Sequence, residues 1–453
     1  MNDQTRKTVQ EAAREVPVVA KSDVVVVGGG PAGIGAAVSA ARNGASVTVL
    51  ERYPHLGGMA SGGMVLVLDD MINGPEITVT GVMTEYIDRM EKIGAAITPP
   101  MEDRVVSQEM WQKWSRWGVH DFHQPTKPQP IVYATAFDPD GFKRVANDLM
   151  VENNINLRLH SWFSSTIVED GKAVGVICET KRGRQAIMGD VIIDASGDLD
   201  VAVSAGASFV EGAYIVTTVF RLGNVDTDKA EAFQYDHPDE FKKIDREARR
   251  IIGGSWDYWW LKTPRPGIVW CNCPHMTGYD GISPEHLTAA EFDGRTRMVN
   301  VLLFARENLP GFEDSYLLDT AEQIGVRQTR MLEGEYVVTK DDVINRRHFE
   351  DTVCRGRDYY TPYRALLPKG VDQLLVAGRH YSVEPEAQKM SREIPPCMAQ
   401  GEATGVAAAL ALNGNISVRD VDPKAIQKQM RAQGADPGDV PSENAGTLDI
   451  AAQ

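Results

Sequence analysis

Short apolar runs, each bounded by glycine or by polar residues, recur along the chain and predict buried strands. The first, Val24 to Val27, is β-branched and uninterrupted, as expected of a strand covered on both faces. An alanine-rich segment with helical spacing, residues 32–43, follows it, and Gly44 is placed to end that helix. Ser46 to Leu50 is a second apolar run. The pattern therefore predicts a strand–helix–strand unit at residues 21–52.

Glycines stand where the first strand turns into the helix. Gly28, Gly30 and Gly33 have the G-x-G-x-x-G spacing, which allows a tight turn, close approach of a pyrophosphate and close helix–strand packing. The free N–H groups at the start of the helix favour a phosphate. Glu51 ends the second strand 18 residues after Gly33, and its carboxylate can accept hydrogen bonds from a ribose. We predict an adenine-dinucleotide site; an incidental glycine turn is the alternative.

Later runs extend the same pattern. Alternating segments 165–169 and 173–180 meet at Asp170-Gly171, which predicts a β-hairpin. A buried strand at 190–194 ends in small residues, a place where ligands bind in open α/β sheets. Another strand is expected at 373–378 and a helix of small residues at 399–412.

Residues 211–370 have a different texture. They contain a polar helix around 227–250, an aromatic segment and alternating strand-like runs, which favour an antiparallel sheet. We expect an α/β fold: a discontinuous Rossmann-like dinucleotide-binding domain interrupted by an inserted α+β, mainly antiparallel domain. The expected boundaries are a polar lead-in at 1–20, the nucleotide-binding domain at 21–210 plus 371–433 with a helical excursion at about 81–130, the inserted domain at 211–370, and a disordered tail at 434–453.

The composition narrows the class of function. The 453 residues carry a net charge of −16 and no long basic run, which disfavours nucleic acid and anionic membranes as partners. No stretch approaches the ~20 apolar residues that span a bilayer. The charged N-terminus lacks the apolar core of a secretory signal. Five scattered cysteines favour a reducing compartment, so we expect a cytoplasmic protein, with no disulfide-reducing pair, no iron–sulfur cluster and no metal.

Six ordered blocks make a family resemblance specific. They are VVVVGGGPAGIGAA, ERYPHLGGMA, DVIIDASGDLDVA, PGFEDSYLLDTAEQIGVRQTRMLEGEYVVTKDDV, PYRALLPKGVDQLLVAGR and SREIPPCMAQGEATGVAAALA. Over residues 22–413 the chain resembles the FAD-dependent oxidoreductases, flavoproteins related to fumarate reductase and glutathione reductase. The resemblance implies bound FAD, and it implies that the inserted domain holds a small-molecule substrate. The short segment CRGRDYYTPYR and Met331 depart from the family pattern, so substrates of relatives do not transfer.

The resemblance also implies which residues contact FAD. They lie in four turns and at the start of the last long helix: Gly28, Gly30, Pro31, Ala32, Gly33, Glu51, Arg52, Gly57, Gly58, Met59, Ala195, Ser196, Gly197, Asp198, Gly378, Arg379, Pro396, Cys397, Met398, Gln400 and Gly401. The helix N-terminus would stabilise negative charge on the reduced flavin. Covalent attachment through His55 or Cys397 is a disfavoured alternative.

Candidate catalytic residues follow from what a flavin reaction requires, a positioned substrate and a base or charge partner. His380 and Tyr381 follow the last predicted strand and are acid–base candidates. Arg392, just before the flavin loop, either binds substrate or fixes that loop. Arg327 and Arg330 could clamp a carboxylate, although a structural salt-bridge network with Glu333, Glu335, Asp341 or Asp342 is the favoured interpretation.

Aromatic residues are dense in two places. Trp256, Tyr258, Trp259 and Trp260, with Trp270, predict an apolar or ring-binding pocket, against core packing or an oligomer contact. Trp111, Trp114 and Trp117, spaced three apart on an expected helix, favour core packing; a pocket wall with His120 and His123 is the minor alternative.

We expect an enzyme that dehydrogenates a small organic, cyclic or apolar substrate by hydride transfer to flavin N5. The middle of the chain has no second G-x-G-x-x-G, which disfavours an NAD(P)H domain. Oxygen, a quinone or an electron-transfer protein would then accept the electrons. A reductase of an activated C=C bond and a non-catalytic redox sensor are the alternatives. The sequence allows a homo-oligomer without indicating one.

Overall fold

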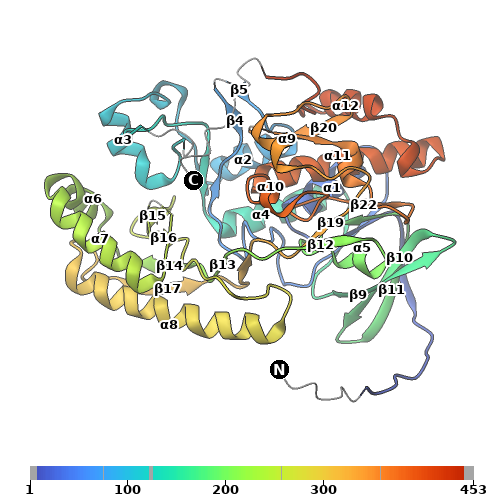
Figure 1. Cartoon of the computed structure of the whole chain (residues 1–453), viewed down its shortest axis with the longest axis horizontal. Coiled ribbons are helices and arrows are strands. Elements are labelled where there is room, and N and C mark those ends of the chain that lie inside the picture. Colours follow the sequence, from blue (N-terminus) through green and yellow to red (C-terminus); the bar gives the residue numbers. More distant parts are fainter. Residues whose placement is uncertain (1–7, 75, 122–125, 257, 358, 443–453) are drawn as a thin grey trace.

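A mixed sheet lies at the centre of the protein, as shown by a computed structural model that describes residues 8–74, 76–121, 126–256, 258–357 and 359–442 (Figure 1). Its strands are β1 (Val18–Val27), β2 (Val47–Leu50), β8 (Asn156–Arg158), β9 (Trp162–Glu169), β10 (Lys172–Thr180), β11 (Gly183–Asp194) and β22 (Leu374–Val376). The order is β8-β2-β1-β11-β10-β9, with β22 also paired to β11.

Strands β8, β2, β1, β11 and β22 run parallel. Val24 pairs with Val47 on one side and Val191 on the other, and the run from Val24 to Val26 is completely buried. This burial explains the continuous apolar pattern of β1. The α/β fold with a parallel nucleotide-binding sheet is confirmed.

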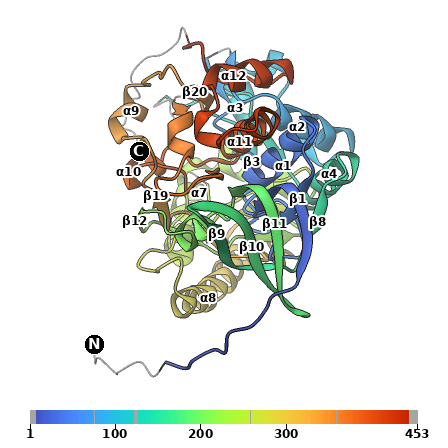
Figure 2. The ribbon, with the colours of Figure 1, turned by 90° about the vertical axis from the view of Figure 1, so that its right-hand side faces the viewer.

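The hairpin at Asp170-Gly171 is confirmed. Strands β9 and β10 pair antiparallel and extend the sheet beyond the parallel strands, as Figure 2 shows. Both turn residues adopt positive φ, 48° at Asp170 and 78° at Gly171. This conformation matches the two-residue turn that Asp-Gly favours.

Helices surround the parallel strands. They are α1 (Pro31–Arg42), α2 (Val82–Lys92), α4 (Pro139–Glu152), α5 (Asp200–Ser204), α11 (Ile394–Gly414) and α12 (Pro423–Ala432). Glycines let α1 and α11 approach closely. A Cβ at Gly401 would lie 1.9 Å from the Ala32 carbonyl oxygen, and a Cβ at Gly405 2.3 Å from that of Ala36. The fold therefore needs a hydrogen at both positions, because a methyl group would push the helices apart.

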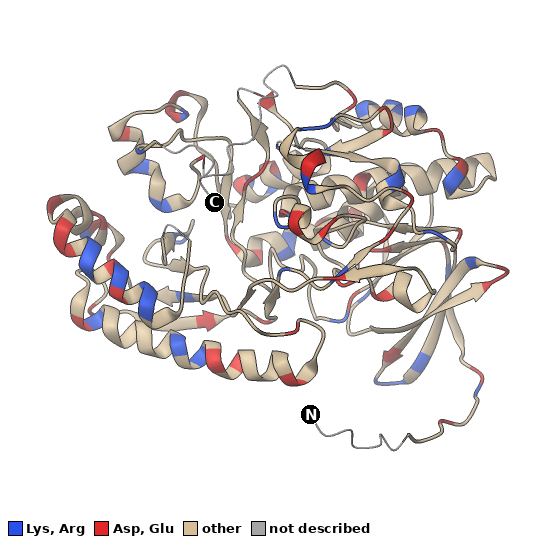
Figure 3. Ribbon diagram, viewed as in Figure 1, with Lys and Arg blue, Asp and Glu red and all other residues tan. Residues whose placement is uncertain are grey.

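Residues 209–332 form further elements. Helices α6, α7 and α8 and strands β14 to β17 lie at the lower left of Figure 1, whereas β12 and β19 lie near α5. A four-stranded antiparallel sheet, β15-β16-β14-β17, lies beside the long helix α8. The predicted polar helix is two helices, because Pro238 begins the second. Acidic and basic residues alternate along α7 and α8 (Figure 3). The elements are β12 (Phe209–Glu211), β13 (Val216–Thr217), β14 (Phe220–Gly223), α6 (Thr227–Asp236), α7 (Pro238–Ile252), β15 (Leu261–Lys262), β16 (Val269–Cys271), α8 (Pro284–Asn308), β17 (Tyr316–Thr320), β18 (Gly325–Val326) and β19 (Arg330–Leu332).

Short elements fill the remaining connections. They are β3 (Val67–Leu68), β4 (Ile72–Asn73), β5 (Glu76–Ile77), β6 (Ala96–Ile97), α3 (Gln108–Trp114), β7 (Thr135–Phe137), α9 (Lys340–Ile344), β20 (Thr352–Arg355), β21 (Tyr360–Pro362) and α10 (Pro385–Gln388). The tryptophan segment is α3 followed by a 3₁₀ turn, not one continuous helix. Trp111 and Trp114 are buried against Val119 and Ile131, as core packing requires. His123 lies outside the described residues.

The ordered structure extends further toward both ends of the chain than the sequence predicts. Strand β1 begins at Val18, inside the expected lead-in. The prediction of a disordered tail is wrong for residues 434–442, because hydrogen bonds hold this segment against the rest of the protein. The Asp436 N–H donates to Thr80 Oγ1 at 2.8 Å, and Ser442 Oγ donates to Glu76 Oε2 at 2.7 Å. Residues 443–453 lie outside the described residues. In the part of the chain that is described, no helix is long and apolar enough to cross a membrane.

Glu402 gives the fold a testable pH dependence. This carboxyl, buried in α11, accepts a hydrogen bond from the Val82 N–H at 3.1 Å, at the start of α2. Burial raises the pKa of Glu402 from 4.5 to about 7. The folded state therefore keeps a proton that the unfolded chain releases, and this stabilisation is complete below about pH 4.5 and is lost as the pH rises through 7.

Glu402→Gln should keep the acceptor oxygen for Val82 and have no proton to lose. We expect the free energy of unfolding of this variant to fall less steeply between pH 4.5 and 7 than that of the wild type. Denaturant unfolding at several pH values measures the slope. Glu307→Gln, at an exposed position of α8, should keep the wild-type slope. Equal slopes for Glu402→Gln and the wild type would contradict the assignment.

Candidate active site

Four strand ends meet at one edge of the sheet. The parallel strands β1, β2, β11 and β22 end in Gly28, Glu51, the Ala195–Asp198 turn and Gly378. Backbone hydrogen bonds join neighbouring ends, from Gly28 N–H to the Leu50 oxygen at 2.8 Å and from Ala195 N–H to the Val27 oxygen at 2.9 Å. Ligands bind at this edge of open α/β sheets. The structure thus brings together four segments that are distant in the sequence.

The glycine turn has the geometry that the sequence predicts. Gly28 adopts φ +107°, and a Cβ at Gly33 would lie 1.8 Å from the Gly28 carbonyl oxygen. A Cβ at Gly58 would lie 3.0 Å from the Gly30 Cα, so the second glycine loop lies against the first. Helix α1 begins after Gly30 without a side-chain cap, and Pro31 occupies its first turn. Its N–H groups remain available for an anion.

Glu51 holds this turn. Its buried carboxylate accepts hydrogen bonds from the Gly29 N–H at 2.7 Å and the Tyr53 N–H at 2.9 Å. The Arg52 guanidinium, next in the chain, lies over the rings of Tyr53 at 5.1 Å and Trp162 at 5.6 Å. A carboxylate and an aromatic–guanidinium surface are therefore adjacent at the end of β2.

Asp194 organises the turn after β11. Its fully buried carboxylate accepts hydrogen bonds from Ser196 and from the Ala202 N–H, and His380 Nε2 lies 3.3 Å away. Burial alone would raise the pKa of Asp194, but the contacts with His380 and Ser196 hold it below the ordinary value. His380 is thus occupied behind the strand end and does not reach the cavity described below.

Asp198 and Arg379 connect two of the strand ends. Asp198 Oδ1 accepts hydrogen bonds from Arg379 Nη2 at 2.9 Å and from Thr329 Oγ1 at 2.7 Å. Burial opposes ionisation of Asp198, but the positive charges of Arg379 and Arg52 lower its pKa. Arg379 is held beside Gly197, where a Cβ would lie 3.0 Å from its guanidinium.

The first two turns of α11 lie over the same edge. The helix begins at Ile394, five residues before the predicted start, so Pro396, Cys397, Met398 and Gln400 are helical and do not form a loop before it. Gln400 Oε1 accepts a hydrogen bond from the Gly378 N–H at 2.9 Å. Gln400 Nε2 and Arg379 Nε are buried and have no hydrogen-bond partner among the described residues. Gly401 faces α1, as does the Met398 carbonyl, so Gly401 serves the helix crossing rather than direct ligand contact. The Cys397 thiol has its pKa raised by burial to about 12, which disfavours a reactive thiolate.

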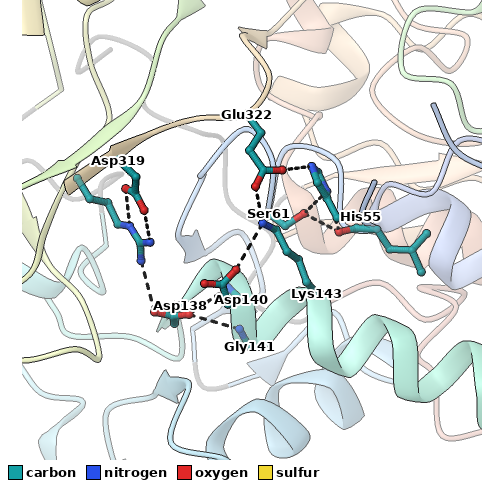
Figure 4. A network of polar contacts seen from close by, with 10 residues as sticks. His55, Ser61, Asp138, Asp140, Gly141, Lys143, Asp319 and Glu322 are labelled. Carbon is teal, nitrogen blue, oxygen red and sulfur yellow. Dashed lines mark hydrogen bonds and ion pairs between the residues drawn. The ribbon is translucent and has the colours of Figure 1, made fainter. Parts of the chain in front are cut away.

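Charged contacts connect the glycine loop to the inserted sheet (Figure 4). His55 Nε2 lies 2.6 Å from Glu322 Oε2, and Lys143 Nζ lies 2.9 Å from Glu322 Oε1. Asp138 caps α4 and lies 3.4 Å from Arg221 of β14. His55 thus lies in this network, where its Nε2 faces Glu322.

A cavity of about 850 Å³ extends from this edge into the inserted elements. Met59, Arg379 and Ile394 line it on the nucleotide-binding side. Trp256, Tyr258 and Trp270 line it from the inserted segment, together with aliphatic residues such as Val65, Val67 and Leu261. Its size suits a small organic molecule.

The prediction that four aromatic residues line the pocket is wrong for two of them. Trp259 and Trp260 are buried in the core of the inserted segment, where their rings pack against Phe312 at 5.6 and 5.4 Å. Tyr381 is also buried away from the cavity, and its hydroxyl donates a hydrogen bond to Ser391 Oγ at 2.8 Å. Burial raises its pKa, so it is not an acid–base group near neutral pH.

The three arginines proposed for the site do not lie together. Arg327 and Arg392 line the cavity. Arg330 instead forms an ion pair with Asp200 at 2.5 Å. The expected partners were Glu333, Glu335, Asp341 and Asp342. Arg327 Nη2 lies 3.2 Å from His275 Nε2, and its guanidinium lies 5.4 Å from the centre of the Trp256 ring.

Asp69, which the sequence analysis missed, lies in the cavity wall next to the site. Burial and the neighbouring charge of Glu393 together raise the pKa of Asp69 to about 7, against the opposing charges of Arg392 and Arg357. Asp69 and Glu393 come from distant segments, so only the fold brings them together. The adjacent acids Asp69-Asp70, directly after an apolar run, were the available sequence signal.

Comparison with known proteins agrees with this geometry. The family model for FAD-dependent oxidoreductases matches residues 23–360 and 355–430, and the chain belongs to this family. No curated protein matches the sequence.

Matches to solved structures extend over most of the chain. A geranylgeranyl bacteriochlorophyll reductase-like protein from Thermoplasma acidophilum is 16% identical with a TM-score of 0.47, covering 91% of this chain and 83% of that one. p-Nitrophenol 4-monooxygenase from Pseudomonas putida is 13% identical with a TM-score of 0.48, covering 91% and 84%. L-Amino acid deaminase from Proteus vulgaris is 13% identical with a TM-score of 0.42, covering 92% and 95%. Similarity at this level does not identify a substrate.

The residues present fit FAD. The glycine turns leave room for a pyrophosphate, the start of α1 has no side-chain cap, and the buried Gln400 Nε2 and Arg379 Nε have no partner among the described residues. Glu51 and Arg52 suit the ADP half, and Met59 and the start of α11 suit the flavin half. FAD is the cofactor of this family.

Glu51 provides a test of the ADP end. Glu51→Gln removes one carboxylate acceptor from a turn that needs two, so we expect FAD affinity to fall roughly tenfold or more. Titration of apoprotein with FAD, followed by flavin fluorescence, measures the dissociation constant. Glu307→Gln should bind as the wild type does. Unchanged affinity of Glu51→Gln would contradict the role of Glu51.

Proposed function

We propose that this FAD-dependent oxidoreductase oxidises a small organic molecule with a cyclic or apolar body. The cavity of about 850 Å³ carries the proposal, because residues of the nucleotide-binding edge and an aromatic wall line the same space. When bound, FAD supplies a two-electron acceptor. A substrate would lose a hydride to it and a proton to the protein. Oxygen, a quinone or an electron-transfer protein would then take up the electrons.

The chain's own residues have distinct roles in this proposal. Trp256, Tyr258 and Trp270 contact the apolar body of the substrate, with Trp270 buried and Trp256 half exposed. Asp69 accepts the substrate proton, since a carboxylate with a pKa of about 7 is a suitable base near neutral pH. Burial keeps that pKa high, with charge repulsion from the neighbouring Glu393 as the second cause. Arg379 stays paired with Asp198 at the boundary between cofactor and cavity.

Anaerobic reduction of the bound flavin tests the direction of the reaction. We expect a panel of small cyclic alcohols, amines and acids to contain a compound that bleaches the visible flavin band of the purified holoenzyme in the absence of oxygen. Rapid bleaching by NADH or NADPH alone would contradict the proposal. Reoxidation of the reduced enzyme by an enone or enoate, with no bleaching by any reduced compound, would favour the C=C reductase.

Asp69 predicts the pH dependence. The rate of flavin reduction should rise with pH and level off above about 7, because the unprotonated carboxylate is the active form. Asp69→Asn should reduce this rate by roughly 10²- to 10⁴-fold and abolish the step near pH 7. Stopped-flow absorbance measures the rate across pH.

Asp228→Asn is the matched control, because the Asp228 side chain is 95% exposed on α6. It should retain the wild-type rate and pH profile. A full rate in Asp69→Asn, or an unchanged step near pH 7, would remove Asp69 from the reaction.

A further inference from the structure

One guanidinium in the cavity wall has no carboxylate partner. Arg327 follows β18 directly and faces the cavity with Gly325 and Val326. The structure's described residues provide it with no ion pair within 4.0 Å. The Arg327 guanidinium contacts His275 Nε2, 3.2 Å from its Nη2, and the Trp256 ring, whose centre lies 5.4 Å away.

The other arginines of the wall differ. Arg379 pairs with Asp198 at 2.9 Å, and Arg357 pairs with Asp121 at 2.7 Å. Arg392 lies 3.8 Å from Glu393, a longer contact, and its Nε is buried without a hydrogen-bond partner among the described residues. Positive charge is thus least compensated where Arg327 and Arg392 approach each other.

His275 does not neutralise this charge. Burial, together with the positive charge of Arg327, lowers the pKa of His275 to about 3, so its imidazole is neutral and accepts the hydrogen bond from Arg327. Burial and the neighbouring Arg392 also lower the pKa of Arg327. Both pKa values are lowered by burial and by neighbouring positive charge, while Glu393 acts in the opposite direction on Arg327. An anion placed beside Arg327 and Arg392 would be stabilised by this partly buried positive charge.

Aromatic rings border the same place. The centre of the Tyr214 ring is 5.1 Å from the Lys389 ammonium and 5.9 Å from the Arg392 guanidinium. Trp256 lies against Arg327. Asp69 and Glu393, nearby in the wall, would repel a doubly charged group such as phosphate. A single planar carboxylate fits a guanidinium fork with less repulsion.

We propose that Arg327, with Arg392 beside it, binds the carboxylate of the substrate, so that the substrate class is a small organic acid with a cyclic or apolar body. This inference rests on the proposed function, because it concerns the same cavity. The carboxylate would lie at the cationic end, and the apolar body would lie along Trp256, Tyr258 and Trp270 toward the nucleotide-binding edge.

Binding of unreactive acids to the holoenzyme tests the inference without turnover. Benzoate, phenylacetate and cyclohexanecarboxylate are the probes, and benzamide and inorganic phosphate are the comparison ligands. Flavin difference absorbance and isothermal titration calorimetry measure the dissociation constants. We expect at least one acid to bind at least tenfold more tightly than benzamide and phosphate.

Arg327→Gln should weaken that binding by roughly 10- to 100-fold, since it removes charge-assisted hydrogen bonds. Arg327→Lys keeps the charge but loses the fork, so its dissociation constant should lie between those of the wild type and Arg327→Gln. Arg295→Gln, at an exposed position of α8, should bind as the wild type does. Bound FAD per protein and melting temperature show that each variant is folded.

Protection from phenylglyoxal gives a second measurement. Arg327 should be modified in the free holoenzyme and protected by the bound acid, as peptide mass spectrometry would show. If no acid binds more tightly than benzamide, or if Arg327→Gln binds the acid as well as the wild type, the inference is overturned. The proposed oxidation has a separate readout: flavin bleached by a neutral cyclic compound would retain that function while the carboxylate subsite fails.

Discussion

The close crossing of α1 and α11 is the constraint on which the site depends. Helix α1 carries the glycine turn at its start, and α11 carries Gln400 and the residues that face the cavity at its own start. Gly401 and Gly405 allow the backbones to touch, because a Cβ there would lie only 1.9 Å and 2.3 Å from carbonyl oxygens of α1. Two segments nearly 370 residues apart, at Pro31 and at Gln400, are thereby fixed at the same edge of the sheet. Without that contact, the two halves of a dinucleotide site would not face one another.

The sequence predicts the features that depend on local geometry. Glycine spacing, a terminal Glu51 and small residues after a buried strand each report a backbone requirement within a few residues, and the structure shows these segments together. The Asp170-Gly171 turn is equally local, because positive φ at both positions decides the turn type.

Residue roles that depend on tertiary surroundings were harder to predict. His380 and Tyr381 follow a strand that ends at the correct edge, but their side chains contact Asp194 and Ser391 instead of the cavity. Trp256 and Tyr258 face the cavity, while Trp259 and Trp260 pack against Phe312. Asp69 owes its raised pKa to burial and to Glu393. None of these environments can be read from neighbouring residues, because distant segments create them.

The charged network around Glu322 has a thermodynamic consequence. Glu322 and Asp319 belong to the inserted elements, whereas His55, Lys143 and Asp138 belong to the nucleotide-binding part (Figure 4). His55 lies only two residues before Gly57, whose N–H donates to Gly29 in the glycine turn. A ligand that binds only the folded arrangement of the glycine loop stabilises that arrangement by mass action. The contacts of His55 and Lys143 with Glu322 belong to the same arrangement, so such a ligand also stabilises the attachment of the inserted sheet against local unfolding.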